Sequence, residues 1–240
     1  MIAVKRHFRH LRWQARPRNY HAVVRDSGGC NVGLRERKKR RTRATLIDVA
    51  VRLCGEQGYD KTTVEQIAAA ADVSPRTFSR YFATKDAVVL TLIEDLVTAV
   101  AHEIAEIPPE VPALETLKRA HVNVLTAVAA GQAGALTAER IVLMLRIVNS
   151  TPGLKAVATE FRPRPTSVAM ARRLGLPEAD PYLQLVIAVW SAVVSTACGD
   201  LVTGRDGLEL GPELMAKRIE TTYADFLDLT TDVPRLAARV

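Results

Sequence analysis

The chain has 240 residues, of which 48% are hydrophobic but only 5% aromatic, and its formal net charge is +7. This length exceeds one average domain, so we expect more than one structural unit. Three cysteines, at positions 30, 54 and 198, are too few and too scattered for a disulfide framework, which favours the reducing cytoplasm as the location.

The positive charge is concentrated at the amino-terminal end of the chain. Residues 1–43 contain 14 Lys and Arg against 2 Asp and Glu, whereas the remaining residues carry a net charge of −5. Charge blocks of this kind are commonly solvated tails, and we expect a disordered basic extension over residues 1–34. A basic segment beside a folded unit can also attract nucleic-acid phosphates. We favour this second interpretation for residues 35–43.

The first two expected helices precede a sharp turn. The first spans about residues 42–57 and ends at Gly58; its apolar face carries Leu46, Ile47, Ala50, Leu53 and Cys54. The second follows Thr63, which has the capping-box spacing to Gln66. It ends at Asp72, because aspartate is among the few non-glycine residues that tolerate a left-handed backbone.

A third, short helix is expected to start at Ser74 and Pro75, a hydroxyl cap followed by proline at the first helical position. Phe78 and Phe82 are expected to face the core. The polar residues of this segment are expected to face outward: Arg76, Thr77, Ser79, Arg80 and Tyr81. Two short helices joined by a tight turn, the second carrying arginines and hydroxyls, predict a helix-turn-helix whose second helix enters a DNA major groove.

The segments RTRATLIDVAVRLCGEQGYDKTTVEQIAAAADVS and PRTFSRYFATKDAVVLTLIEDL resemble the DNA-binding domain of the tetracycline-repressor-like (TetR) family of transcriptional regulators. The resemblance covers residues 40–96 closely, and beyond them only length and helical character match. Asp72 stands where many members have glycine, and some forty residues precede the first helix. Because VGLRERKKRRTR is similar to the start of many members, we expect translation to begin near Val32, which the intact mass of the native protein tests.

The expected contacts to DNA bases follow from side-chain chemistry. Arg76 and Arg80 can each form bidentate hydrogen bonds to guanine. Thr77 and Ser79 can contact bases or phosphates, although simple helix-surface positions are the alternative for both. Ser74 stands at the amino end of the same helix.

The expected contacts to the DNA backbone follow partly from the resemblance. By their positions in the family motif, Tyr81 and Lys85 would hold the backbone and set the register. Thr63 offers a hydroxyl and a helix amino terminus to a phosphate. Arg43 is expected to reach the backbone or the minor groove.

Downstream of this motif, the pattern remains helical. Helices are expected over about residues 85–106 (capped by Thr84), 113–130, 136–149, from Pro152 with a break at 162–165 and a further piece to Leu174, then 181–203 and 212–229. Strand signals are scarce. The apolar stretch of residues 183–198 is shorter than the roughly 20 residues that a membrane span needs, so we expect it to be buried in protein.

The expected fold class is therefore all-α. An N-terminal three-helix helix-turn-helix DNA-binding domain is followed by a C-terminal helical ligand-binding and dimerisation domain. The expected boundaries are a basic extension at residues 1–34, the DNA-binding domain at 35–84 and the helical domain at 85–240.

The resemblance also implies how such a protein works. The last two long helices would pair with those of a second subunit, so a homodimer would read a palindromic operator in double-stranded DNA. A small effector molecule, apolar or amphipathic given the prevalence of Val, Leu, Met and Ala, would release this repressor from DNA. The expected lining residues, each of which has an ordinary core or surface position as its alternative, are His121, Asn123, Leu125, Met144, Arg146, Val148, Phe161, Met170 and Trp190.

No residue pattern indicates catalysis, a metal site or a cofactor. The histidines, at positions 7, 10, 21, 102 and 121, show no ligand spacing, and neither a phosphate-binding glycine loop nor a Gly-x-Ser-x-Gly motif occurs. We therefore expect no enzyme. The alternatives are an architectural DNA-binding protein without an effector pocket, and an enzyme or small-molecule carrier that uses the same fold.

Overall fold

The computed structural model describes residues 30–150, 155, 164–201 and 209–237. Throughout these ranges the regular elements are helices, and no strand occurs among them. The helices are α1 (Cys30–Gln57), α2 (Val64–Ala70), α3 (Pro75–Ser79), α4 (Lys85–Glu106), α5 (Ala113–Ala129), α6 (Ala138–Ser150), α8 (Arg164–Leu174), α9 (Pro181–Cys198) and α10 (Pro212–Ala237). The all-α prediction is confirmed.

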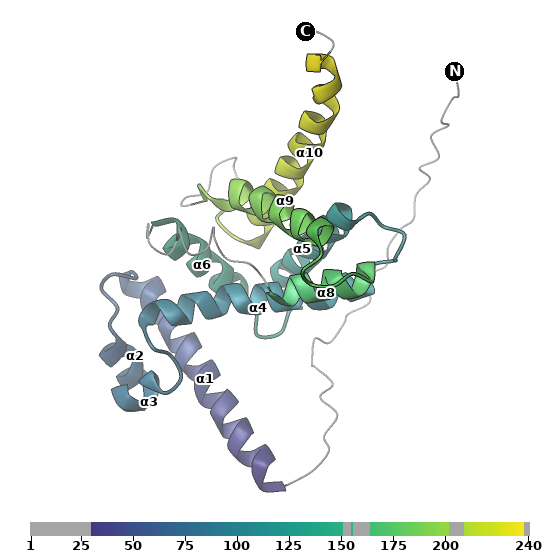
Figure 1. Ribbon diagram of the computed structural model, residues 1–240. Helices are drawn as coiled ribbons and strands as arrows, with labels where there is room; N and C mark the ends of the chain where they lie inside the picture. Colours follow the sequence, from purple (N-terminus) through teal and green to yellow (C-terminus); the bar gives the residue numbers. More distant parts are fainter. Residues whose placement is uncertain (1–29, 151–154, 156–163, 202–208, 238–240) are drawn as a thin grey trace.

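Helices α1 to α3 form a small unit at one end of the molecule, and α4 leads from it into the helical body (Figure 1). In the body, α4 packs against α5, α6 and α8, while α10 packs against α5 and α9. The carboxyl-terminal part of α10 projects from the opposite end of the molecule to α3 (Figure 1). Helix α4 therefore touches both the small unit and the body.

Polar side chains fix the start of three helices where the sequence predicts them. Thr63 accepts a hydrogen bond from the Gln66 amide while the Gln66 side chain accepts one from the Thr63 amide, which completes a capping box before α2. Thr84 accepts from the Ala87 amide at the start of α4. Each cap satisfies amides that have no partner within the helix, which explains why these boundaries are accurate.

Helix α1 differs from the prediction, because it begins at Cys30 rather than near residue 42. Residues 30–34 are therefore helical and not a disordered tail. The physical reason is that Arg, Lys and Glu have high helix propensity and continue a helix that the buried part of α1 has already nucleated. Residues 1–29 lie outside the described part, and a start near Val32 stays a prediction.

Three other boundaries also shift. Helix α9 ends at Cys198 rather than near residue 203, and α10 continues to Ala237 rather than 229. The segment expected to be helical from Pro152 falls almost entirely on residues that are not described. Helix α8 begins at Arg164, within the expected break at residues 162–165. Pro165 lies in its first turn, where the missing backbone N–H does not remove a hydrogen bond of the helix.

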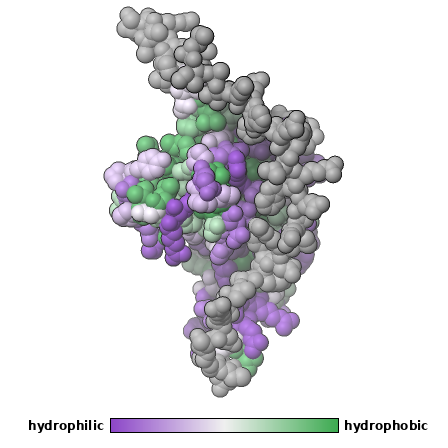
Figure 2. All heavy atoms as spheres, turned by 90° about the vertical axis from the view of Figure 1, so that its right-hand side faces the viewer, coloured by the Kyte–Doolittle hydropathy of each residue, from purple (hydrophilic) through white to green (hydrophobic). Residues whose placement is uncertain are grey.

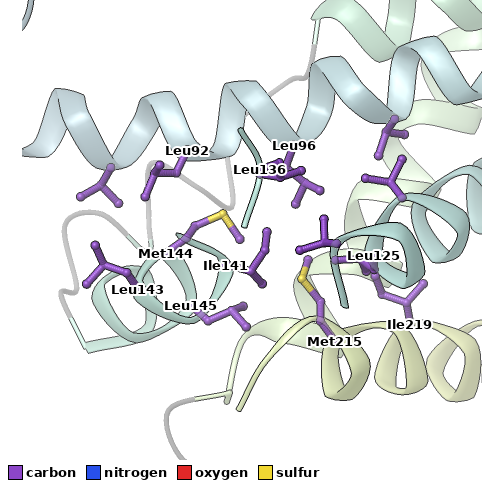
Figure 3. Close-up of a cluster of buried hydrophobic side chains, with 14 of the residues drawn as sticks. Leu92, Leu96, Leu125, Leu136, Ile141, Leu143, Met144, Leu145, Met215 and Ile219 are labelled. Atoms are coloured by element: carbon purple, nitrogen blue, oxygen red, sulfur yellow. The ribbon is translucent and has the colours of Figure 1, made fainter. Parts of the chain in front are cut away.

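The core of the body lies between α4, α5, α6 and α10 (Figure 3). Leu92 and Leu96 extend from α4 towards Met144 of α6, and Met215 of α10 lies beside Leu125 of α5 (Figure 3). These side chains are buried, with exposed fractions of 5% or less. A movement of α6 must therefore also displace α4, because a closely packed side chain cannot move without moving its neighbours.

One described helix, α9, has the length and composition that would let it cross a membrane. Core helices of water-soluble proteins pass the same test. Leu183, Ile187 and Trp190 of α9 are buried, and the helix packs against α5, α8 and α10. The packing agrees with the prediction that this helix is buried in protein.

Candidate DNA-binding surface and effector cavity

The turn between α2 and α3 sets the direction of the short third helix. Asp72 has a φ of 53°, a left-handed conformation that Asp adopts more easily than most side chains. The Val73 amide donates to the Ala68 carbonyl at 2.9 Å, which closes the end of α2. Ser74 then caps α3 by accepting a hydrogen bond from the Thr77 amide at 3.1 Å.

Helix α3 is anchored through one aromatic pair. Phe78 is 0% exposed and Phe82 3%, and their ring centroids lie 5.7 Å apart. Arg76 and Arg80, one helical turn apart, are exposed on another face. Among the described residues, no carboxylate forms an ion pair with either guanidinium. Both therefore remain available to an external partner.

The hydroxyl groups around α3 already have local partners. Ser74 Oγ and Thr77 Oγ1 lie 3.0 Å apart, and Ser79 donates to the Pro75 carbonyl at 3.1 Å. Thr77 and Tyr81 are half-buried, whereas Ser74 and Ser79 are exposed. Contacts from these hydroxyls would use their remaining lone pairs, so the arginines offer the stronger donors.

Arg43 and Lys85 are half-buried and have hydrogen-bond partners within the domain. Arg43 donates to Thr91 Oγ1 of α4 at 3.2 Å, and its guanidinium lies 5.4 Å from the centre of the Phe82 ring. Lys85 Nζ donates to the carbonyls of Tyr59 and Thr62 at 2.6 and 3.0 Å. Both cations tie α4 to neighbouring elements, and their contacts to DNA stay a prediction.

Thr63 remains exposed at the amino end of α2. Its hydroxyl accepts a hydrogen bond from the Gln66 backbone amide at 3.2 Å. Gln66 Oε1 accepts two hydrogen bonds of 2.9 Å, one from the Thr63 backbone amide and one from Gln57 Nε2. The hydroxyl proton of Thr63 is not used by these bonds. The geometry therefore leaves a donor for a phosphate at this position.

An apolar cavity of about 160 Å³ lies in the body. Four of the residues predicted to line an effector pocket line it: His121, Met144, Val148 and Trp190. A wider surface depression of about 1000 Å³ lies between α1, α6 and the start of α10, and charged side chains such as Arg52 and Glu56 line it. We take the smaller cavity as the effector site, because ligand pockets are concave and mostly apolar.

The other predicted lining residues lie elsewhere. Leu125 and Met170 are 0% exposed within the core, and Asn123 donates to Glu103 of α4 at 2.8 Å. Arg146 lines the wider depression, and Phe161 lies outside the described residues. Helical spacing alone does not distinguish a side chain that packs against a neighbour from one that faces an empty volume.

Sequence reasoning missed several polar residues of the cavity. These residues are Asn149, Lys155, Thr166, Ser191, Ser195 and Cys198. Thr166 is 1% exposed, and its Oγ1 is the one buried side-chain oxygen or nitrogen of the described part that has no hydrogen-bond partner. Such a group costs free energy unless something satisfies it, which points to a polar atom of a guest molecule. No sequence motif marks this threonine.

His121 and Trp190 form the aromatic wall of the cavity. Their ring centroids lie 5.0 Å apart, and Trp190 Nε1 lies 3.4 Å from His121 Nε2. The other ring nitrogen, Nδ1, lies 2.8 Å from the Leu117 carbonyl, which fixes the proton on Nδ1. Burial lowers the pKa of His121 from 6.5 to about 4, although the Leu117 carbonyl opposes this shift. His121 is therefore neutral at physiological pH.

This neutral histidine predicts how stability depends on pH. Because the folded pKa is depressed, the unfolded chain binds a proton between pH 6.5 and about 4 that the folded protein does not. The contribution of the neutral His121 to the free energy of unfolding is fully present above pH 6.5. The free energy of unfolding should fall by about 3 kcal/mol as the pH falls through this window. Urea denaturation across the window should show a smaller pH slope in His121→Phe. The exposed His102 provides the control, since His102→Gln should keep the wild-type slope; equal slopes in all three proteins would contradict the assignment.

Within the described residues, no group of three or more His, Cys, Asp or Glu side chains is arranged to hold a metal ion. Burial raises the pKa of the Cys198 thiol at the cavity to about 12, so it stays protonated and uncharged. The cavity therefore has the chemistry of a binding site, without an activated nucleophile at this cysteine.

Two short helices joined by a left-handed turn, with an arginine-bearing helix on the surface of an all-helical body, define the helix-turn-helix class of DNA-binding proteins. The profile of the family described as bacterial regulatory proteins, tetR family, matches residues 46–92. The HTH-type transcriptional regulator TcmR of Streptomyces glaucescens is 38% identical over 166 residues, which cover 67% of this chain and 73% of that protein. The chain belongs to the TetR family of transcriptional regulators.

Two solved structures of TetR-family proteins match the chain. FadR of Thermus thermophilus, a TetR-family transcriptional repressor in complex with lauroyl-CoA, matches with a TM-score of 0.48 and 20% identity over 75% of this chain and 93% of that one. A TetR-family transcriptional regulator from Streptomyces coelicolor matches with a TM-score of 0.45 and 19% identity over 83% of this chain and 86% of that one.

Proposed function

We propose that this chain is a ligand-responsive repressor that leaves a palindromic operator when a small apolar or amphipathic molecule enters the cavity of the body. One observation carries the proposal: α4 and α6 line the apolar cavity, and the same two helices contact the DNA-binding unit, α4 through the Arg43–Thr91 hydrogen bond and α6 through its packing against α1. The division into a basic extension, a DNA-binding domain over residues 35–84 and an effector domain over 85–240 is part of this proposal.

Base reading falls to the exposed face of α3. Arg76 and Arg80 donate to guanine O6 and N7 in the major groove, the commonest specific contact between proteins and DNA. Thr77 and Tyr81 add hydroxyl contacts to the adjacent backbone, Ser79 does so when its hydroxyl turns away from the Pro75 carbonyl, and Thr63 donates to a phosphate from the start of α2. The assignments of Arg76, Arg80, Ser79 and Thr63 follow from their exposure and their donors, and those of the half-buried Thr77 and Tyr81 follow from their hydroxyl groups.

A homodimer would present two copies of α3 to one duplex. Four of the five large apolar side chains that are strongly exposed in the described part lie on α9 and α10: Tyr182, Leu185, Leu227 and Leu229. Apolar surface concentrated on two neighbouring helices is typical of a protein interface. Two-fold symmetry would then place the reading helices about 34–36 Å apart, or a multiple of this, on a symmetric operator. As a chromosomal regulator, the protein would act in the cytoplasm.

The chemistry of the cavity restricts the effector. No Asp or Glu is among the described residues that line it, His121 is neutral, and the one lining cation is Lys155, whose Nζ donates to the Gly199 carbonyl at 2.6 Å. A cationic guest would find no counter-charge there. A neutral or anionic molecule with an apolar body and one polar atom for Thr166 fits the lining better. At about 160 Å³, the cavity holds a group about the size of benzene and must widen for anything larger.

Helix α6 connects this cavity to the DNA-binding unit. Met144, Leu145 and Val148 line the cavity, and Arg140, one turn earlier, is 6% exposed and bonds to Asp48 of α1 at 2.5 Å. Arg140 also lies 4.0 Å from Asp95 of α4. A guest that shifts α6 would therefore move the ion pair between the buried guanidinium of Arg140 and the exposed Asp48 of α1. A ligand changes DNA affinity only by its difference in affinity for the two arrangements, and the effect is reciprocal.

Thr166 provides a prediction that needs no knowledge of the effector. Its buried hydroxyl has no hydrogen-bond partner in the described part of the protein, so Thr166→Val should raise the free energy of unfolding by about 1 kcal/mol. The same change should lower the affinity for the effector, because the effector loses its hydrogen bond to the Thr166 hydroxyl. Thr116 is also buried, but its hydroxyl donates to the Val111 carbonyl, so Thr116→Val should destabilise the protein. An equal loss of stability in both variants would show that the Thr166 hydroxyl has a hydrogen-bond partner within the protein and is not available to an effector.

The proposal is tested by selecting genomic DNA fragments with the purified full-length protein and then releasing them with candidate molecules. The expected result is a two-fold symmetric sequence in the bound fragments, with release by a neutral or anionic apolar compound. An architectural DNA-binding protein would bind without sequence preference, show a steep salt dependence and resist release. Tight binding of a small molecule without any DNA preference would instead indicate a carrier or an enzyme.

A further inference from the structure

The first third of α1 is an isolated basic helix. Its first buried side chain is Leu46, sixteen residues after the helix begins at Cys30, which corresponds to about 24 Å of helix. All residues from 33 to 41 are exposed, and six of them are Arg or Lys against one acidic residue, Glu36. Figure 1 shows this part of α1 running past α3 and away from the helical body. We call residues 33–41 the arm.

The arm and the turn of the helix-turn-helix enclose a groove of about 510 Å³. Ala71 and Val73, on either side of the left-handed residue, form one wall, and Val73 directly precedes the cap of α3. The other wall is a single face of α1, whose members recur at helical spacing: Leu34, Arg37, Lys38, Arg41, Thr42 and Thr45. The groove is therefore continuous with the proposed base-reading surface.

The polar groups of this groove are suited to an anion. Three of the eight lining residues are cations and none is acidic; Asp72 and Glu36, the nearest acidic residues in sequence, do not line it. The hydroxyls of Thr42 and Thr45 already donate to the Lys38 and Arg41 carbonyls, so the charged groups supply the available donors. Arg37 uses Nε to donate to the Gly33 carbonyl, which leaves its terminal nitrogens for a partner. Where the lower end of the molecule is coloured in Figure 2, hydrophilic side chains stand out.

We propose that this groove holds the phosphodiester backbone of the DNA that flanks each half of the operator, with Arg37, Lys38 and Arg41 as the phosphate contacts. The inference rests on the proposed function, because it assigns a second contact surface to the same duplex. A duplex is the occupant that fits, since one strand leaving the groove of α3 would continue along cations that span about one helical turn, from Arg37 to Arg41. The arm adds affinity and length of contact, and it leaves base preference to α3.

The consequence is a large salt dependence that originates in the arm. Each phosphate neutralised contributes roughly 0.9 to the slope of log affinity against log salt. Removing three cations per subunit should therefore lower the magnitude of the slope by up to about 3 per subunit. The protected region on the DNA should shorten at both outer edges, while the ratio of affinities for operator and scrambled duplex stays unchanged.

The experiment compares two triple variants of the full-length protein on the selected duplex. The groove variant is Arg37→Ala, Lys38→Ala, Arg41→Ala. The matched control is Arg35→Ala, Lys39→Ala, Arg40→Ala, which removes the same charge from other faces of the same exposed helix. Alanine keeps helix propensity in both variants. Binding is titrated at several salt concentrations, and hydroxyl-radical footprints report the protected backbone.

The groove variant alone should lose the outer protection, and its salt slope should fall by up to about 3 per subunit. Equal losses of protection and salt slope in the two variants would show a general effect of charge and no specific groove. A groove variant that binds like the wild type would show that the arm does not contact DNA. Either result overturns the inference while the proposed function stands. A wild-type protein that prefers no duplex would overturn both.

Discussion

Replacing both Arg76 and Arg80 by alanine is expected to weaken binding to the selected operator by about 2–6 kcal/mol, since each bidentate guanine contact contributes about 1–3 kcal/mol of discrimination. Both guanidinium groups are exposed on α3 and have no carboxylate partner among the described residues. Their loss should thus leave the fold intact. Fluorescence anisotropy with the operator and a scrambled duplex measures the effect, and the variant should bind both with similar affinity.

Arg172→Ala is the control for this double substitution. Arg172 is an exposed arginine of α8, in the body and away from the helix-turn-helix, so its loss should change binding only slightly. Single substitutions separate the two reading positions. If the double variant retained the operator preference of the wild type, α3 would not be the reading helix.

The second large effect concerns the anchor of α3. Phe78 is 0% exposed and packs against Phe82, so Phe78→Ala should lower the free energy of unfolding by about 3–5 kcal/mol through lost burial and the cavity that remains. The helix would then lose its fixed orientation, and operator binding should fall even though no DNA-contacting side chain has changed. Chemical denaturation followed by circular dichroism measures the first effect, and anisotropy measures the second.

Phe78→Leu separates packing from side-chain identity. Leucine retains most of the apolar volume and should cost clearly less than alanine in both measurements. A Phe78→Ala protein that is as stable as the wild type would contradict the burial of this ring. A destabilised protein that still binds the operator with full affinity would show that α3 does not depend on the anchor.

The start of each short helix could be predicted because the interactions that fix it are local. Thr63 and Gln66 satisfy each other across three residues, and Ser74 and Thr84 each accept from an amide three residues later. The left-handed conformation of Asp72 was likewise predictable from the residue type. In each case the whole interaction lies within one turn of the chain, where sequence spacing determines the geometry.

Roles that depend on distant partners could not be predicted in the same way. Lys85 finds its carbonyl acceptors 23 and 26 residues earlier, and Arg43 finds Thr91 48 residues later. The family motif suggests DNA contact for Lys85, but a cation whose donors are satisfied internally has less to offer a phosphate. Spacing along one element does not reveal which of its cations another element will bind.

The cavity shows the same limit. His121, Met144, Val148 and Trp190 could be selected as large or polar residues on apolar helices, but Leu125 and Met170 have the same pattern and pack in the core. Thr166 was missed because its distinguishing property, a buried oxygen without a partner, exists only once α4 and α9 pack against α8. The length of α1 was missed for another reason: its charge suggested disorder, whereas its residues also favour helix.

The most direct test of the central claim is a competition titration of the purified protein at moderate salt, with the selected duplex and a scrambled duplex of the same composition. A regulator that reads bases through α3 should prefer its own site by about a thousandfold or more, and the Arg76→Ala, Arg80→Ala protein should lose that preference. Equal affinity of the wild-type protein for both duplexes would contradict the account.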